Sequence, residues 1–184
     1  TIPGWLDELN ADCKIPSQLT CDNMRQWVKA GAQYCPTQWT VTNYETITRY
    51  GKDLQGVFDC IIVDESPRIK NPKAQVTKAA LRLAEDCENK AILTGCPNPE
   101  SFADYYCQYQ FLTSPQPFMG FPKFWGWRKF YMRQELHTWH PFVLSSGRLR
   151  ESTERYTYRL KRKDIGINIS VTRQVRYIDL PGKL

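Results

Sequence analysis

The clearest pattern along the chain is an apolar run within residues 58–65 that stops on two adjacent carboxylates. The run is rich in β-branched side chains and is too short for a typical helix. A short apolar run without alternation is typical of a strand covered on both faces, as in parallel sheets. The pattern therefore predicts a buried strand whose carboxyl end carries Asp64 and Glu65.

Apolar patterns after this strand predict alternating helices and strands. Residues 73–85 carry apolar side chains at helical spacing, and residues 90–94 form a second short apolar run that ends at Gly95. Two prolines favour a loop at residues 66–72. This order is expected for an α/β fold with a parallel sheet flanked by helices on both faces. Further predicted elements are helices at 5–9, 21–30, 43–50 and 101–112, and strands at 38–42 and 174–180.

The composition changes after residue 113, where prolines, glycines and aromatic side chains crowd together with basic residues between them. For Trp125, Trp127 and Trp139, core or inter-lobe packing is favoured over base stacking, because stacking requires exposed aromatics beside basic groups. Residues 155–163 are basic. A phosphate-facing patch and a solvated face are equally open interpretations of that segment.

Composition and charge exclude some classes of protein. The 184 residues have a formal net charge of +6, which permits a polyanionic partner without requiring one. The seven cysteines lack the close spacing of a zinc site. Cys60 and Cys87 lie in segments expected to be buried, which favours reduced thiols in an intracellular protein over secreted disulfides. No apolar run approaches the length of a membrane span, so we expect no membrane partner.

Asp64 and Glu65 are the first candidates for chemistry. In open α/β sheets, ligands bind just beyond the carboxyl ends of the strands. Two acids beside a core are costly unless something positive binds them, and a divalent metal that carries a nucleotide phosphate would do so. An ordinary strand that ends in a polar turn explains the dipeptide alone equally well, so the surrounding motifs have to decide.

Several blocks of sequence occur in a specific order around the 58–65 strand. Val-Thr-Asn-Tyr-Glu at 41–45 precedes it, Arg-Ile-Lys-Asn at 68–71 follows it, and Leu-Thr-Gly-Cys-Pro at 93–97 comes about one helix later. This order resembles the first RecA-like lobe of superfamily-two helicase-like ATPases, and among them the Swi/Snf-type DNA translocases. Trp-Leu-Asp-Glu at 5–8 is similar to the W-x-x-E block of that lobe, and residues 158–164 are similar to its basic end.

The resemblance implies a partial RecA-like P-loop NTPase lobe that uses ATP and Mg²⁺. In this family, the acid that matches Asp64 holds Mg²⁺ on ATP through water. The acid that matches Glu65 orients and activates the attacking water, a role that phosphoryl transfer requires. Thr94 and Gly95 match the motif that couples the nucleotide site to nucleic acid.

The resemblance also implies contacts to DNA. Thr42, Asn43 and Tyr44 match positions where the family contacts the backbone of a DNA strand, and a hydroxyl and an amide are suitable phosphate donors. Arg68 and Lys70 are further candidates, although a solvated loop, or a brace within it, explains them nearly as well. The partners implied are duplex DNA and a second RecA-like lobe in the same parent chain.

The sequence departs from the family pattern at several places. Ser66 and Pro67 replace the usual small residue and His, and Cys96 replaces the second Thr of L-T-G-T-P. No G-x-x-x-x-G-K-[S/T] phosphate loop occurs, so we expect the isolated chain to hydrolyse ATP poorly. In the family that loop lies before the W-x-x-E block, so we expect it upstream of Thr1. Residues 91–93 would then border a bare apolar edge.

The chain is therefore expected to divide into three parts. Residues 1–113 form the portion of the ATP-binding lobe after the phosphate loop, residues 114–147 an aromatic-rich insertion, and residues 148–184 the basic end of the lobe. The predicted function is that of part of a DNA-dependent ATPase, a helicase-like hydrolase that couples ATP hydrolysis to movement on DNA.

Other functions remain open on the sequence alone. The alternative is a non-catalytic nucleic-acid-binding or interaction module that kept the fold without hydrolysis. A DEAD-box-type RNA enzyme fits the 68–71 and 93–97 blocks less well. The expected location is cytoplasmic in a prokaryotic or viral host and nuclear in a eukaryote.

Overall fold

The computed structural model describes residues 2–11, 18–19, 21–29, 31, 39–135, 138–141, 143–161, 164 and 166. The predicted strand at 174–180 lies outside these residues. Three helices and two short strands come first: α1 (Ile2–Ala11), β1 (Gln18–Leu19), α2 (Cys21–Lys29), β2 (Trp39–Thr40) and α3 (Tyr44–Tyr50). Gly31 follows α2 with a φ of 98°, and its N–H donates to the carbonyl of Val28, as expected for a glycine that ends a helix.

The middle of the chain contains the predicted alternation of strand and helix. Its elements are β3 (Cys60–Val63), η1 (Ser66–Ile69), α4 (Gln75–Glu85), β4 (Asn89–Ile92), η2 (Phe102–Asp104) and α5 (Tyr105–Thr113). The predicted loop at 66–72 thus contains one short 3-10 turn. Ser101 caps η2, since its hydroxyl accepts from the N–H of Ala103 while Asp104 accepts from the N–H of Ser101.

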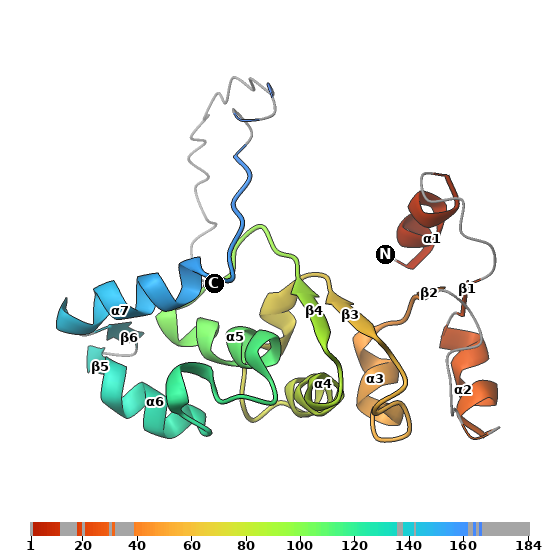
Figure 1. Ribbon diagram of the computed structural model, residues 1–184, viewed down its shortest axis with the longest axis horizontal. Coiled ribbons are helices and arrows are strands. Elements are labelled where there is room, and N and C mark those ends of the chain that lie inside the picture. The colour runs from red at the N-terminus through yellow and green to blue at the C-terminus, as the bar shows by residue number, and fades with distance from the viewer. Residues whose placement is uncertain are drawn as a thin grey trace, which may run out of the picture.

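Strands β3 and β4 are paired in parallel, as the sequence predicts. Cys60 lies opposite Asn89 and Val63 opposite Ile92, so both strands end at the same edge. Figure 1 shows the two arrows side by side, with α4 beneath them. In the part of the chain that the structure describes, β3 is the one strand neighbour of β4. The fold is therefore mixed helix and strand, with a small parallel sheet.

Helices cover one face of this sheet in the described residues. Val63 packs with Ala80 and Ala84 of α4 and with Phe111 of α5, and Ile61 and Ile92 lie against this cluster. On the opposite face, Ile62 is 44% exposed and Cys60 is exposed. The predictions of a strand buried on both faces and of a buried Cys60 are therefore wrong in this structure, whereas Cys87 is buried as expected. An apolar run specifies apolar side chains but not the elements that cover them.

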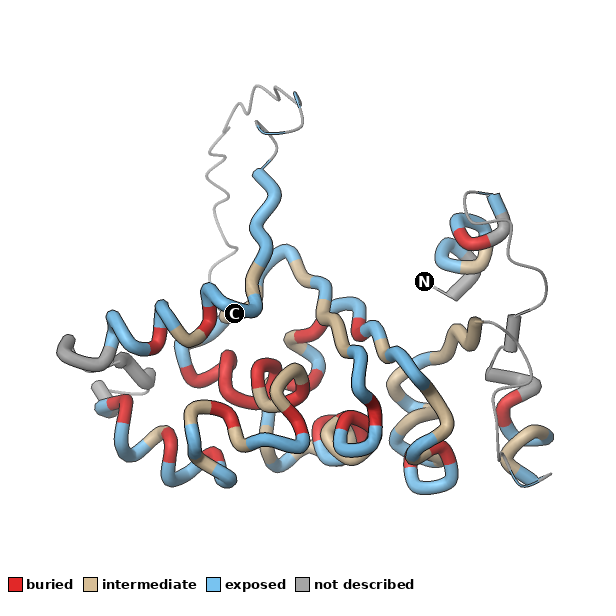
Figure 2. Tube along the Cα trace, in the orientation of Figure 1, coloured by how far each residue is buried: buried red, intermediate tan, exposed pale blue. Residues whose placement is uncertain are grey.

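The spacing of apolar residues in α4 is confirmed as the buried face of a helix. The helix buries two pairs of side chains on successive turns, Ala79 with Ala80 and Leu83 with Ala84. Thr77 is buried as well. Figure 2 shows the buried segments concentrated in the helices below the strands, whereas β3 is largely exposed or intermediate. Leu93, just beyond β4, is 42% exposed. The position of the two strand ends thus depends on helix packing from one side.

The aromatic segment forms a second core with α5. It contains η3 (Phe118–Gly120), α6 (Phe124–Tyr131), the antiparallel pair β5 (Met132–Glu135) and β6 (Thr138–Pro141), and then α7 (Val143–Glu154). Trp127 is fully buried against Tyr106, Phe118 and Phe124. Core packing is therefore confirmed for Trp127. Trp125, on the same helix, is 47% exposed and lies under the guanidinium of Arg128.

The buried Trp127 and the exposed Trp125 should differ in how much each contributes to stability. We expect Trp127→Ala to lower the free energy of unfolding by about 3–5 kcal/mol, because it leaves a large cavity among packed rings. Trp125→Ala on the same helix is the matched control, and loss of its exposed cation–π contacts should cost about 1 kcal/mol or less. Chemical denaturation of the two variants measures both values. Equal losses would contradict the placement of the two rings.

Candidate functional site

The end of β3 is tied to the end of β4 by backbone hydrogen bonds that continue past the strands. The N–H of Leu93 donates to the carbonyl of Val63 over 2.8 Å, and the N–H of Ser66 donates to the carbonyl of Leu93 over 3.0 Å. Glu65 lies between them with φ 50° and ψ 54°, in the left-handed region. The chain therefore reverses sharply at Glu65, and Asp64-Glu65 and Thr94-Gly95 lie on two loops joined at their bases.

The carboxylate of Asp64 is oriented by two donors. Its Oδ1 accepts from the N–H of Glu65 over 2.9 Å, and its Oδ2 accepts from the indole Nε1 of Trp5 over 3.1 Å. Asp64 and Glu65 are both exposed. In the described residues, the Glu65 carboxylate has no hydrogen bond or ion pair. One acid is thus fixed in orientation, while the next stays available to a ligand or to water.

Tyr44, in the first turn of α3, stabilises the chain reversal at Glu65 through its hydroxyl. Its hydroxyl donates to the carbonyl of Asp64 and lies 3.3 Å from that of Glu65. Burial, together with the charges of Asp64 and Glu65 and against the opposing effect of Arg68, raises the pKa of Tyr44 to about 12. The phenol therefore remains a neutral donor throughout the physiological range. It holds backbone carbonyls here rather than facing solvent.

The other candidates for DNA contact surround Tyr44. Asn43 caps α3, since its Oδ1 accepts from the N–H of Thr46 over 2.8 Å, while Thr42 is half-buried just before it. The guanidinium of Arg68 lies over the Tyr44 ring, 5.4 Å from its centre, and pairs with Glu45 at 3.5 Å. The side chains of Arg68 and Glu45 are 60% and 73% exposed, so this ion pair is weak.

Arg68 lines an open depression of about 640 Å³ between α3 and the start of α4. Its lining side chains are those of Tyr44, Glu45, Thr48, Arg49, Arg68 and Val76. The structure thus brings Tyr44 and Arg68 together at one surface that borders the two acids. Lys70 does not belong to it.

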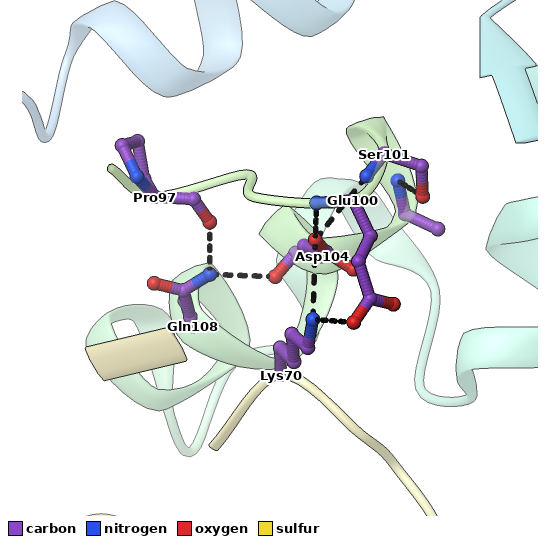
Figure 3. Close-up of polar contacts among 7 residues, drawn as sticks. Lys70, Pro97, Glu100, Ser101, Asp104 and Gln108 are labelled. Carbon is purple, nitrogen blue, oxygen red and sulfur yellow. Dashed lines mark hydrogen bonds and ion pairs between the residues drawn. The ribbon is translucent and has the colours of Figure 1, made fainter. Parts of the chain in front are cut away.

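Lys70 points to the opposite side of the η1 turn, toward the start of α5. Its Nζ lies 2.5 Å from Oε1 of Glu100 and 3.7 Å from Oδ2 of Asp104, and its side chain is 22% exposed. Figure 3 shows the ammonium between the two carboxylates. In this geometry Lys70 braces the loop, which is one of the two interpretations that the sequence leaves open.

Thr94 and Gly95 form a compact turn after β4. The hydroxyl of Thr94 accepts from the N–H of Cys96 over 3.0 Å, a hydrogen bond typical of threonine at the start of a turn. Gly95 is exposed, and a Cβ built on it would meet no atom within 4 Å. Space around the backbone is therefore left open at the position predicted to couple nucleotide and nucleic acid.

Gln108, which sequence reasoning missed, connects the two loops. It lies on α5 and is fully buried. Its Oε1 accepts from the Ser66 hydroxyl over 2.6 Å, and its Nε2 donates to the carbonyls of Pro97 and Asp104 over 2.5 and 2.7 Å. Figure 3 shows the Pro97 and Asp104 contacts. A polar side chain among the apolar positions of a predicted helix is the one signal that marks it.

The two acids fit a metal that arrives with its ligand. Among the described residues, no group of three or more His, Cys, Asp or Glu could hold a metal ion. Mg²⁺ is usually bound through one or two carboxylates together with waters and substrate phosphates, so two adjacent exposed carboxylates suit it. Within the same part of the chain, no helix is long and apolar enough to cross a membrane.

Comparison with known proteins places the chain in a family. The family model described as the SNF2-related domain matches residues 1–180, so the chain belongs to that family, whose domain is RecA-like.

Three relatives show how much of a larger protein the match spans. The chain is 29% identical over 97 residues to the transcriptional regulator ATRX homolog of Drosophila melanogaster, covering 53% of this chain and 6% of the relative. The second relative is the SWI/SNF-related matrix-associated actin-dependent regulator of chromatin subfamily A-like protein 1 of Drosophila melanogaster. The chain is 33% identical to it over 85 residues, which are 46% of this chain and 11% of the relative. It is 32% identical over 73 residues, or 39% of its length, to chicken DNA repair and recombination protein RAD54B, of which 8% is covered.

The environment of Tyr44 can be measured by spectroscopic titration. The difference in phenolate absorbance between the wild type and Tyr44→Phe should rise near pH 12, because burial and the two acids raise the pKa from its usual 10.0. The stabilisation from Tyr44 should be complete below pH 10 and should decline as pH rises toward 12, since the unfolded chain loses its proton first. A difference signal that is complete near pH 10 would contradict the buried phenol.

Proposed function

We propose that this chain is part of the ATP-binding lobe of a Swi/Snf-type DNA-dependent ATPase that couples ATP hydrolysis to movement on DNA. The observation that carries the proposal is the adjacent pair Asp64 and Glu65, exposed at the carboxyl end of β3 and joined by backbone hydrogen bonds to the Thr94-Gly95 loop. Ligands of open α/β sheets bind at this edge. Membership of the SNF2-related family supports the same reading.

Each acid has an environment that suits its proposed role. Asp64 is held by the Trp5 indole and the Glu65 N–H, which leaves lone pairs on both oxygens for the water shell of Mg²⁺. Glu65 is one residue further along, and its free carboxylate suits a base that positions the attacking water. When bound, Mg²⁺ with ATP would supply charge neutralisation at the transferred phosphoryl group. The lysine and backbone of a phosphate loop, which this sequence lacks, would come from elsewhere in the parent protein.

The DNA-facing surface of the proposal is the depression beside α3. Arg68 and Arg49 supply positive charge there, and Thr42 and Asn43 lie at the start of α3. Arg68 pairs weakly with Glu45, so a phosphate can replace that carboxylate at little cost. Lys70 is left out of this surface, because its ammonium is held by Glu100 and Asp104.

The relatives support the choice of partner. Two carry names that refer to chromatin regulation and to DNA repair and recombination. By this likeness we infer a duplex DNA partner, a second RecA-like lobe in the parent chain, and a nuclear location if the source is eukaryotic. Residues 1–113 would belong to the nucleotide-binding lobe proper, with 114–147 as its aromatic insertion and 148–184 as its basic end.

Hydrolysis by the full-length protein should depend on Glu65. We expect Glu65→Gln to lower DNA-stimulated ATP turnover by about 100-fold or more, because the water loses its positioning base. Binding of ATP should persist, since the amide keeps the shape of the side chain. Asp59→Asn at the opposite end of β3 is the matched control and should leave turnover unchanged. Equal turnover in Glu65→Gln and wild type would refute the catalytic assignment of Glu65, and absence of turnover in both would favour the non-catalytic module.

Binding of duplex DNA should depend on Arg68. Arg68→Ala should weaken binding about equally across sequences and reduce the slope of log affinity against log salt by about one, as for one phosphate contact. Lys78→Ala removes an exposed cation from α4 and serves as the control. A titration of labelled duplex at several salt concentrations measures both slopes. An unchanged slope for Arg68→Ala would remove this residue from the DNA surface.

A further inference from the structure

Gln108 is the feature of the core that packing alone does not explain. Its neighbours on α5, including Tyr106, Cys107, Tyr109 and Phe111, are almost entirely apolar or aromatic and buried. A buried amide among them costs free energy unless its polar atoms are paired. All three hydrogen bonds of Gln108 go to carbonyls or a hydroxyl at 2.5–2.7 Å, so the amide is well satisfied.

Two partners of Gln108 lie next to the candidate site residues. Ser66 directly follows Glu65, and Pro97 lies two residues after Gly95. One planar amide therefore holds both the loop that carries the proposed catalytic acid and the loop that carries the proposed coupling motif. Ser66 is also one of the positions at which the sequence departs from the family pattern, where a small residue is usual. The hydroxyl introduced at that position is the atom that Gln108 binds.

A second set of contacts fixes the base of this link. Lys70 joins the η1 turn to Glu100, and Asp104 accepts from the N–H groups of Glu100 and Ser101. Figure 3 shows that these contacts and those of Gln108 converge on the start of α5. Because both loops are bonded to one helix, neither can shift by a large fraction of an ångström without lengthening a hydrogen bond of Gln108.

We propose that Gln108 is a positioning residue that transmits displacement of the Thr94–Pro97 loop to Glu65 through Ser66. The inference rests on the proposed ATPase function and adds a residue and a route to it. Gln108 is fully buried, so it acts through its partners and not by binding a ligand; it makes the position of Glu65 depend on the state of the loop after β4. Coupling of this kind is reciprocal, so nucleotide binding and DNA binding should affect each other by the same factor through it.

Three variants of the full-length protein test the proposal. Gln108→Leu removes the link, Ser66→Ala removes one bond with little change in volume, and the double variant replaces both partners by apolar groups. Gln110→Leu is the matched control, because Gln110 lies on the same helix and also bonds to backbone, but its partners are Gln116 and Phe118 in the aromatic segment. For each protein, ATP turnover is measured with and without duplex DNA, together with the melting temperature.

We expect Gln108→Leu to lower the ratio of DNA-stimulated to basal turnover by about fivefold or more, within the range of measured coupling energies. The KM for ATP should change by less than about twofold, since binding of substrate is not the step affected. A readout independent of turnover is the shift in DNA affinity caused by a non-hydrolysable ATP analogue. That shift should shrink by a similar factor in Gln108→Leu and remain intact in Gln110→Leu.

The double variant distinguishes transmission from simple stability. Replacing both partners of a buried hydrogen bond by apolar groups costs less than removing one. The double variant should therefore regain melting temperature relative to Gln108→Leu without regaining DNA stimulation. Recovery of both together would overturn the proposal. If Gln108→Leu does not fold, Ser66→Ala decides, because a stimulation ratio equal to that of wild type would overturn the proposal.

Failure of the inference can be told apart from failure of the proposed function. Absence of DNA-stimulated turnover in the wild type would refute the ATPase assignment, and turnover unaffected by Glu65→Gln would refute the role of Glu65; either result removes this inference as well. Loss of turnover in Glu65→Gln, with stimulation ratios in Gln108→Leu and Gln110→Leu both equal to that of wild type, would overturn the role of Gln108 alone.

Discussion

The parallel pairing of β3 with β4 is the constraint on which the rest of the site depends. Parallel strands end at a common edge, and here two further backbone bonds link the chain beyond the strands: the N–H of Leu93 donates to Val63 and the N–H of Ser66 donates to Leu93. The left-handed turn at Glu65 follows from this, because the chain must reverse to bring the Ser66 N–H back to β4. A residue held in that region persists only where its surroundings fix it, and the hydroxyl of Tyr44 contributes to doing so.

The two faces of the sheet are buried to different extents, and this difference determines which contacts orient the strand ends. One face of β3 and β4 packs on α4 and α5, while Ile62 and Leu93 are 44% and 42% exposed on or beside the other. The covered face supplies the rigidity that orients the strand ends. The second core, formed by aromatic side chains around Trp127, stiffens α5 from its far side. Helix α5 thus packs against both cores, and Gln108 on this helix forms hydrogen bonds to both loops.

Much of this arrangement follows from local sequence. The strands at 60–63 and 89–92, the buried spacing in α4 and the cap at Ser101 are all indicated by residues near one another in the chain. The remainder depends on contacts between distant segments. No local pattern says that Ile62 is uncovered, that the Tyr44 hydroxyl reaches the carbonyl of Asp64, or that Gln108 meets Ser66 across 42 positions. The two acids could be proposed from the sequence because motif order is specific, whereas Gln108 belongs to no motif.

Arg68 and Lys70 show what a difference of two positions means in a 3-10 turn. Both are cations in one short block, yet Arg68 extends over the Tyr44 ring at an exposed surface, and Lys70 lies between two carboxylates with 22% of its side chain exposed. Exchanging lysine and arginine should therefore disturb different contacts at the two positions. At position 68 the guanidinium lies over the Tyr44 ring, so lysine would keep the charge but lose the planar contact. At position 70 the ammonium contacts the carboxylates of Glu100 and Asp104, and a planar guanidinium would have to reproduce both contacts. Two cations of one short block are thus held by different kinds of contact, Arg68 at an exposed ring and carboxylate and Lys70 between two carboxylates.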